Sequence, residues 1–291
     1  MTCPLCGNAQ SRPSWLGTLR YAGREFPYVE CTSCRSLYAS PMPDQATLSR
    51  MYGLEYETAA AVASGHGIED PKERRRVVSW LRGRPAGTFL DYGCGGGQLL
   101  TAVNGIGWRA LGVEFDPDVA AATAQRVGVP VASRFSVDAL ALEPPADVLH
   151  LGDVIEHLTD SDTELPRILK LIKPGGFLVA QGPLEANPSL FTNLLKLARR
   201  ARGVTTSEMA PYHVMLATAE GQRAFFRRFG LREVAFSMSE VAWPAPARLT
   251  GDDFINPRLV ALFLVRRISQ TLSAFRPDRW GNRYFYVGQR S

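Results

Sequence analysis

Four of the five cysteines lie near the start of the chain, as two Cys-x-x-Cys pairs formed by Cys3 with Cys6 and by Cys31 with Cys34. Two residues between cysteines allow both thiolates of a tight turn to bind one ion, and two such turns complete a tetrahedron. Because four thiolates leave no coordination position open, we expect a structural zinc ion and a zinc ribbon over residues 1–40. A thiol redox pair and chance spacing are the alternatives.

A second group combines a carboxylate with glycines in the order Asp91-x-Gly93-x-Gly95-x-Gly97, at the end of a strand expected over 88–92. Glycines at a strand-to-helix turn allow a ligand to approach the backbone closely. A glutamine stands where a dinucleotide fingerprint needs its last glycine. A carboxylate would also repel a pyrophosphate, so the loop suits a ligand that carries an ammonium group.

The next expected strand ends at Glu114 and Phe115. An acidic residue about 20 positions after a glycine loop can accept hydrogen bonds from both ribose hydroxyls, and the aromatic ring offers a face for a base. A plain helix-start charge is the alternative for the glutamate. Ligand contacts gather at the carboxyl ends of parallel strands, which adds Asp138, Gly152 and Asp153 as candidates.

These residues need a parallel sheet to position them, and the chain alternates strands and helices from residue 87. The expected strands are 88–92, 110–115, 129–132, 148–152, 176–181, 231–240 and 284–288, and the expected helices are 98–106, 117–127, 161–172 and 219–229. The fold class is therefore α/β. Residues 41–86 are expected to form a linker with two helices.

Two of the four histidines are candidates for a general base, because a neutral imidazole accepts a proton near neutral pH. His157 follows the fourth strand, and His213 lies with Tyr212 in an insertion at about 184–217 that we expect to act as a lid. His157 could equally hold its loop through hydrogen bonds. His150, inside a buried strand, is expected to be structural.

Length and composition fit a globular protein with one full-sized domain and a small module: 291 residues, 45% hydrophobic and 21% charged. No secretory signal and no spanning apolar run is visible, so we expect a cytoplasmic protein with reduced thiols. Residues 184–291 carry 16 Lys/Arg against 8 Asp/Glu. Such a basic segment attracts nucleic acid, an anionic membrane surface or a phosphorylated small molecule, or is simply solvated.

Two amphipathic helices are expected within this basic segment, at 190–198 and 259–272. Core or lid packing is the simpler interpretation. Formation of a homodimer and contact with a lipid-linked substrate at a membrane surface are the alternatives.

The glycine loop with Glu114 and the segments 151–158 and 169–177 together resemble the class I S-adenosylmethionine-dependent methyltransferases. The resemblance covers roughly residues 71–240 and the closing strand. It implies a Rossmann-like seven-stranded sheet ending in an antiparallel hairpin. It also implies that Asp91 lies near the methionine ammonium, Glu114 on the ribose and Asp138 near the adenine amine.

With its four-cysteine segment, the chain also resembles a bacterial subgroup linked to sugar or polysaccharide methylation. The resemblance implies a methyltransferase domain over 87–291, with insertions at about 184–217 and 243–282, that methylates a hydroxyl of a small acceptor such as a sugar or glycan. An RNA base is the alternative acceptor, although no basic tract interleaved with aromatics occurs. A non-catalytic zinc-ribbon binding protein is the alternative of another class.

Overall fold

The computed structural model describes residues 2–51, 71–134, 145–240 and 248–291. Contacts divide the chain into two compact units. The first comprises Met1–Met42, Gly182–Arg228 and Phe236–Phe285, and the second comprises Pro43–Gln181, Phe229–Ala235 and Tyr286–Ser291. The N-terminal segment is thus grouped with two segments that come more than a hundred residues later.

A seven-stranded sheet dominates the second unit, in the order β11-β12-β8-β7-β4-β5-β6. Its strands are β4 Thr88–Tyr92, β5 Arg109–Glu114, β6 Val131–Ser133, β7 Ala146–Gly152, β8 Ile172–Pro183, β11 Leu231–Ser239 and β12 Arg283–Arg290. The pairs β4·β5, β4·β7, β5·β6 and β7·β8 are parallel. The expected α/β fold with seven strands is confirmed.

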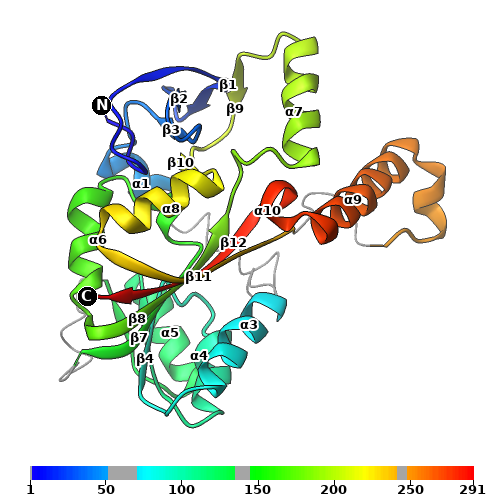
Figure 1. Cartoon of the computed structure of the whole chain (residues 1–291). Coiled ribbons are helices and arrows are strands. Elements are labelled where there is room, and N and C mark those ends of the chain that lie inside the picture. Colours follow the sequence, from blue (N-terminus) through cyan, green and yellow to red (C-terminus); the bar gives the residue numbers. More distant parts are fainter. Residues whose placement is uncertain (1, 52–70, 135–144, 241–247) are drawn as a thin grey trace. The chain divides into compact units, whose positions relative to one another are not determined.

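Helices cover both faces of this sheet, with α6 on one face and α3 and α4 on the other (Figure 1). The helices of this unit are α1 Gln45–Met51, α3 Pro71–Arg82, α4 Gln98–Asn104, α5 Pro117–Val127 and α6 Ser161–Leu169, with the short 3-10 helix η2 Ile155–His157. Asp116 caps α5 by accepting from the amides of Asp118 and Val119, and Gly128 ends it with a φ of 68°. Strands covered on both faces are largely apolar, as β7 shows with the buried side chains of Val148, Leu149 and Leu151.

The helix expected over 161–172 is shorter in the structure, because α6 ends at Leu169 and β8 begins at Ile172. The Lys173–Gly176 segment therefore lies within the strand rather than before it. The β7·β8 register shifts between Ala146 and Val148, which accommodates this irregular start.

The first unit contains a five-stranded sheet in the order β10-β3-β2-β1-β9. Three strands come from the N-terminal segment, β1 Ser11–Tyr21, β2 Arg24–Cys31 and β3 Leu37–Ala39, and two come from the insertion after β8, β9 Thr206–Glu208 and β10 Met215–Leu216. The strand β9 pairs in parallel with β1, and β10 pairs antiparallel with β3 (Figure 1). Segments far apart in the sequence therefore build one sheet.

A hydrophobic core lies against this sheet, formed by Leu16, Leu19, Tyr28, Leu37, Ala39, Ala186 and Leu216. The helices of this unit are α7 Leu190–Ala201, α8 Ala219–Arg228, the 3-10 helix η3 Gly251–Ile255, α9 Pro257–Phe275 and α10 Pro277–Trp280. Within the described ranges, no helix has the length and apolar character needed to span a bilayer.

Candidate functional site: a four-cysteine centre and a glycine-loop site

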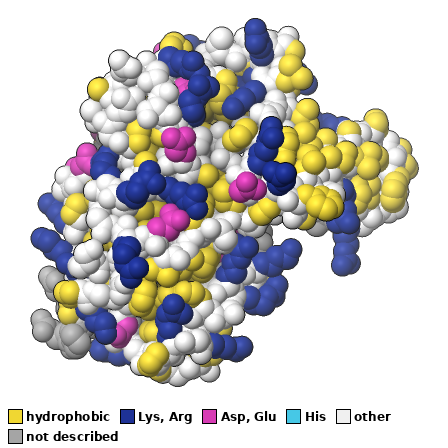
Figure 2. Space-filling model, in the orientation of Figure 1, with side chains coloured by type: hydrophobic (Ala, Val, Ile, Leu, Met, Phe, Trp, Pro, Cys, Tyr) yellow, Lys and Arg dark blue, Asp and Glu magenta, His cyan; other side chains and the backbone are white. Residues whose placement is uncertain are grey.

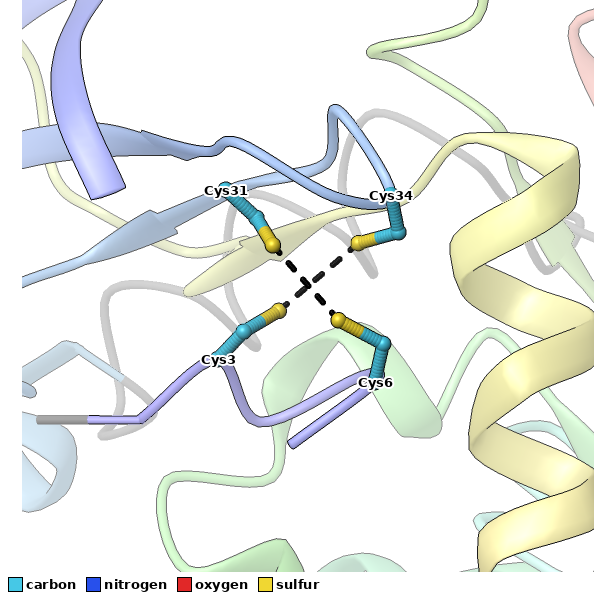
Figure 3. Close-up of side chains that lie close together, drawn as sticks. All are labelled: Cys3, Cys6, Cys31 and Cys34. Atoms are coloured by element: carbon cyan, nitrogen blue, oxygen red, sulfur yellow. Dashed lines mark hydrogen bonds between the residues drawn. The ribbon is translucent and has the colours of Figure 1, made fainter. Parts of the chain in front are cut away.

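The four N-terminal cysteines point toward a common centre in the first unit (Figure 3). The Sγ atoms of Cys3 and Cys34 are 3.8 Å apart and those of Cys6 and Cys31 are 3.5 Å apart, while all four lie within 4.8 Å of one another. A disulfide needs a sulfur–sulfur distance of about 2.05 Å. Tetrahedral zinc bonds of about 2.3 Å give edges of about 3.8 Å, so the four thiols fit a zinc ion.

Tight turns and hydrogen bonds hold both Cys-x-x-Cys segments. The amide of Gly7, whose φ is 79°, donates to the carbonyl of Cys3 at 2.8 Å. From outside the ribbon, the hydroxyl of Thr218 donates to the carbonyl of Cys34 at 2.6 Å, and Arg228 donates to the carbonyl of Cys3 at 3.4 Å. The cysteine centre is therefore tied to the segment that follows β10.

Thiol chemistry favours a metal at this centre. The hydrogen bond from the Cys3 thiol lowers the pKa of Cys34 to about 5, whereas the same bond and burial raise the pKa of Cys3. The thiolate is the form of cysteine that binds zinc. Cys94 lies in the other compact unit, in the glycine loop, and burial raises its pKa.

The glycine loop joins β4 to α4 with the backbone that its sequence predicts. Gly93, Gly95 and Gly97 have φ values of 84°, 46° and 71°, a region that side-chain-bearing residues rarely adopt. A Cβ on Gly95 would meet no atom within 4 Å, so the space above it is open. The hydroxyl of Thr123 donates to the carbonyl of Gly95 at 2.9 Å, and Arg126 donates to that of Gly96 at 2.7 Å.

Glu114 reaches this loop from the end of β5. Its two carboxylate oxygens accept hydrogen bonds from the amides of Gly95 and Phe115, both at 2.7 Å. Burial raises the pKa of this carboxyl above its ordinary value, against the opposing effect of the two amides. Each carboxylate oxygen has a second lone pair, so both can still accept a hydroxyl from a ligand.

Asp91, the carboxylate before the glycines, pairs with His150. The parallel register of β4 and β7 sets the two residues opposite each other, and Nδ1 of His150 lies 2.7 Å from Oδ1 of Asp91. Both side chains are buried, and the imidazole also stacks on Phe89. The Nε2 atom of His150 is buried and has no hydrogen-bond partner among the described residues. This buried contact with His150 therefore sets the orientation of the Asp91 carboxylate.

The remaining residues predicted for this edge of the sheet are Phe115, Gly152, Asp153 and Asp138. The guanidinium of Arg134 lies over the ring of Phe115, 4.7 Å from the ring centre, in a cation–π contact. Asp153, just after Gly152 at the end of β7, has a φ of 52°, and its amide donates to the carbonyl of Gln181 at 3.0 Å. Asp138 lies outside the described residues.

His213 belongs to the first unit and pairs with Glu185. Its Nδ1 lies 2.7 Å from Oε2 of the glutamate, and both side chains are partly exposed. The hydroxyl of Tyr28 on β2 donates to the carbonyl of His213 at 2.7 Å, which fixes the backbone of this loop. A carboxylate at Nδ1 keeps the proton there and leaves Nε2 as the basic atom.

His157 ends η2 in the second unit, so the two histidine candidates belong to different compact units. Sequence reasoning missed both Glu185 and the pairing of His150 with Asp91. An acidic residue four positions after the expected end of a strand was the available signal for Glu185. The partner of His150 required the strand order, which no local pattern provides.

Relatives of the chain are methyltransferases. The chain is 35% identical over 102 residues to a ubiquinone biosynthesis O-methyltransferase of Methylococcus capsulatus, a match that covers 33% of this chain and 42% of that protein. The protein of the same name from Xanthomonas campestris is 29% identical over 167 residues, which is 52% of this chain and 69% of the relative. The chain thus spans less than half of the length of the Methylococcus relative.

A solved structure with the same fold is that of a Burkholderia thailandensis 1,6-didemethyltoxoflavin-N1-methyltransferase with bound S-adenosylhomocysteine, with a TM-score of 0.54 and 16% identity. The match covers 94% of this chain and 99% of that one. A family model described as a methyltransferase domain matches residues 68–235, which include the glycine loop and Glu114. The chain therefore belongs to this methyltransferase-domain family.

Proposed function

We propose that the chain is an S-adenosylmethionine-dependent methyltransferase that methylates a hydroxyl group of a small acceptor, with a sugar or glycan as the leading class, and that His213 removes the hydroxyl proton. The pairing of His213 with Glu185 at 2.7 Å is the observation that carries the proposal. The names of the O-methyltransferase relatives support oxygen as the methylated atom. The resemblance to the sugar-associated subgroup supports the acceptor class.

The glycine-loop site supports a role in holding the cofactor, whose sulfonium supplies an activated methyl group when bound. Gly95 leaves the backbone open to close approach, whereas a Cβ on Gly93 or Gly97 would meet side chains of the protein itself. The lone pairs of Glu114 that the two amides leave free suit the ribose hydroxyls. Asp91, oriented by His150, suits the ammonium group. Phe115, Gly152 and Asp153 complete the proposed set at the carboxyl ends of the strands, and Asp138, outside the described residues, remains a candidate from the sequence alone.

In this mechanism the protein orients the acceptor and removes its proton. Glu185 holds the Nδ1 proton of His213 and stabilises the imidazolium that forms when Nε2 accepts the acceptor proton. Tyr28 fixes the loop through the His213 carbonyl. The segment 184–217 is proposed to exclude water as a lid, because it leaves the carboxyl end of β8, where ligands of such sheets bind.

Zinc is proposed to hold the ribbon without joining the reaction. The cysteine set supplies four ligands of one chemical type with the spacing that tetrahedral zinc requires. These ligands leave no position for an acceptor, so the metal would act through folding alone.

The acceptor is tested by measuring S-adenosylhomocysteine formation with nucleotide sugars, free glycans, phenols and RNA. We expect turnover with a hydroxylated small molecule. Turnover with RNA alone, together with steeply salt-dependent RNA binding, would replace the acceptor class.

The base is tested with the accepted substrate. His213→Ala should lower turnover by roughly 10²–10⁴-fold while the affinity for S-adenosylhomocysteine stays unchanged. Glu185→Gln keeps the size of the side chain but removes its charge, and should lower turnover by roughly tenfold or more and shift its pH profile. His157→Ala is the matched control, and should cost less. If His213→Ala keeps normal turnover, the base is another group, and His157 and Asp153 become the candidates.

A further inference from the structure

Large hydrophobic side chains are exposed in one part of the first unit. Of the ten that are exposed in the described ranges, eight lie on three elements, α7, η3 and α9: Leu194, Leu195, Leu197, Phe254, Ile255, Leu264, Ile268 and Phe275. Both α7 and η3 contact α9, so the three elements form a continuous structure. We call these eight side chains the apolar patch. Figure 2 shows hydrophobic side chains gathered over η3 and α9, with Lys and Arg beside them.

The spacing on α9 places the exposed residues in one row. Leu264, Ile268 and Phe275 are four and seven residues apart, which sets them within about 40° of one another around the helix. They are exposed by 52%, 54% and 80%, whereas Ser269 and Ser273 on another side of the helix are buried. The helix thus has a packed face, through which Ser269 donates to Glu240, and a separate apolar face without a partner among the described residues.

The two helices of the apolar patch, α7 and α9, carry charges of one sign. The helix α7 carries Lys196, Arg199 and Arg200 and α9 carries Arg258, Arg266 and Arg267, and neither helix contains an Asp or a Glu. The acidic side chains of Asp253 and Glu240, near the patch, accept hydrogen bonds from neighbouring residues. The carboxylate of Asp253 accepts from the amide and hydroxyl of Thr250, and Glu240 accepts from Ser269.

A second copy of the chain is the obvious alternative occupant of such a face. Pairing through α9 would bring the arginines of one helix against those of the other, with no acidic side chain on either helix to neutralise them. Like charges across an interface oppose association. A surface that is anionic and apolar at once is complementary to both features of the patch.

We infer that the apolar patch and its arginines form a docking surface for an anionic lipid bilayer, on which α9 lies in the interfacial plane. Leu264, Ile268 and Phe275 would enter the headgroup and acyl boundary, and Arg258 and Arg267 would contact lipid phosphates. The inference concerns peripheral contact only, and it stands independently of the acceptor and of the catalytic base.

The experiment is co-sedimentation of the full chain with vesicles, of phosphatidylcholine alone or of phosphatidylcholine mixed with phosphatidylglycerol. We expect binding to the anionic vesicles, a loss at high salt, and little binding to the neutral ones. Arg258→Gln with Arg267→Gln should weaken binding roughly 10- to 30-fold. Leu264→Ser with Ile268→Ser should weaken it roughly tenfold or more.

Matched controls carry the same chemical changes elsewhere. Val234→Ser removes an exposed apolar side chain of β11, and Arg109→Gln with Arg227→Gln removes two exposed charges of β5 and α8. These variants should bind vesicles as the wild type does, and every variant should keep its affinity for S-adenosylhomocysteine. Equal binding to neutral vesicles, full binding by the patch variants or no binding to either vesicle would overturn the inference. So would a dimer in solution that Ile268→Arg dissociates, because a second copy would then occupy the patch.

Discussion

The Glu114 carboxylate would make the proposed cofactor site sensitive to pH. Burial raises its pKa above the ordinary value of a glutamate, while its proposed task, accepting ribose hydroxyls, requires the ionised form. Cofactor binding would therefore favour proton loss, and affinity should fall as the pH drops through the raised pKa. Titration calorimetry with S-adenosylhomocysteine across the acidic range measures this effect.

Glu114→Gln is the matched variant for that pH dependence. An amide keeps one oxygen acceptor but sets an NH₂ group against a backbone N–H, so affinity should fall roughly 10- to 100-fold at neutral pH. The remaining affinity should vary less with acidity than that of the wild type. An identical pH profile in both proteins would assign the effect to another group.

A second prediction about single residues concerns the buried pair of Asp91 and His150. His150→Leu leaves the carboxylate buried without its partner, which should lower the free energy of unfolding by about 1–3 kcal/mol and weaken cofactor binding. His150→Asn can place an N–H near the former Nδ1 position and should recover most of the affinity. Chemical denaturation and calorimetry of both variants check this. Wild-type affinity in His150→Leu would show that the pair serves folding alone.

Among the elements, the short strands β9 and β10 connect the four-cysteine centre, the proposed zinc site, to the loop of His213. They pair with β1 and β3, and Thr218 bonds to the carbonyl of Cys34. Removing the metal should therefore loosen residues 206–216 as well as the ribbon. Hydrogen exchange before and after chelation should show lost protection in these strands and unchanged protection in β4 and β5.

The metal content of the protein tests the proposed zinc site directly. The wild type should contain about one zinc ion per chain, and Cys6→Ser should lose it together with stability. Cys94→Ser is the matched control, since Cys94 lies in the glycine loop, and it should keep the zinc. A wild-type protein that is fully stable after chelation would contradict a structural role for the metal.

More of the secondary structure could be predicted from the sequence in the second compact unit than in the first. The apolar run at 88–92 predicts a strand, and the Asp-Pro start and glycine end around 117–127 predict a helix. Both elements form as expected. Thr206–Glu208 and Met215–Leu216 are too short to carry any periodic signal, and their partners come from the far end of the chain. The pairing of Glu185 with His213 depends on that sheet, so it could not be foreseen either.

On the scale of the whole molecule, two compact units with different ligands should not unfold as one. We expect two calorimetric transitions. S-adenosylhomocysteine at about 100 times its dissociation constant should stabilise the unit of the glycine loop by about 2.7 kcal/mol. A chelator should lower the other transition. A single transition that responds to both reagents would show one cooperative unit instead.

The position of β1 in its sheet has a consequence for the synthesis of the chain. The strand pairs with β2 through one edge and with β9 through the other, and β9 is Thr206–Glu208. At ribosomal rates that partner emerges roughly 10 to 40 s after β1. The N-terminal strands thus wait with an open edge, which in other chains invites aggregation. The two Cys-x-x-Cys turns are complete by residue 34, so a zinc ion can hold the nascent ribbon together during this wait.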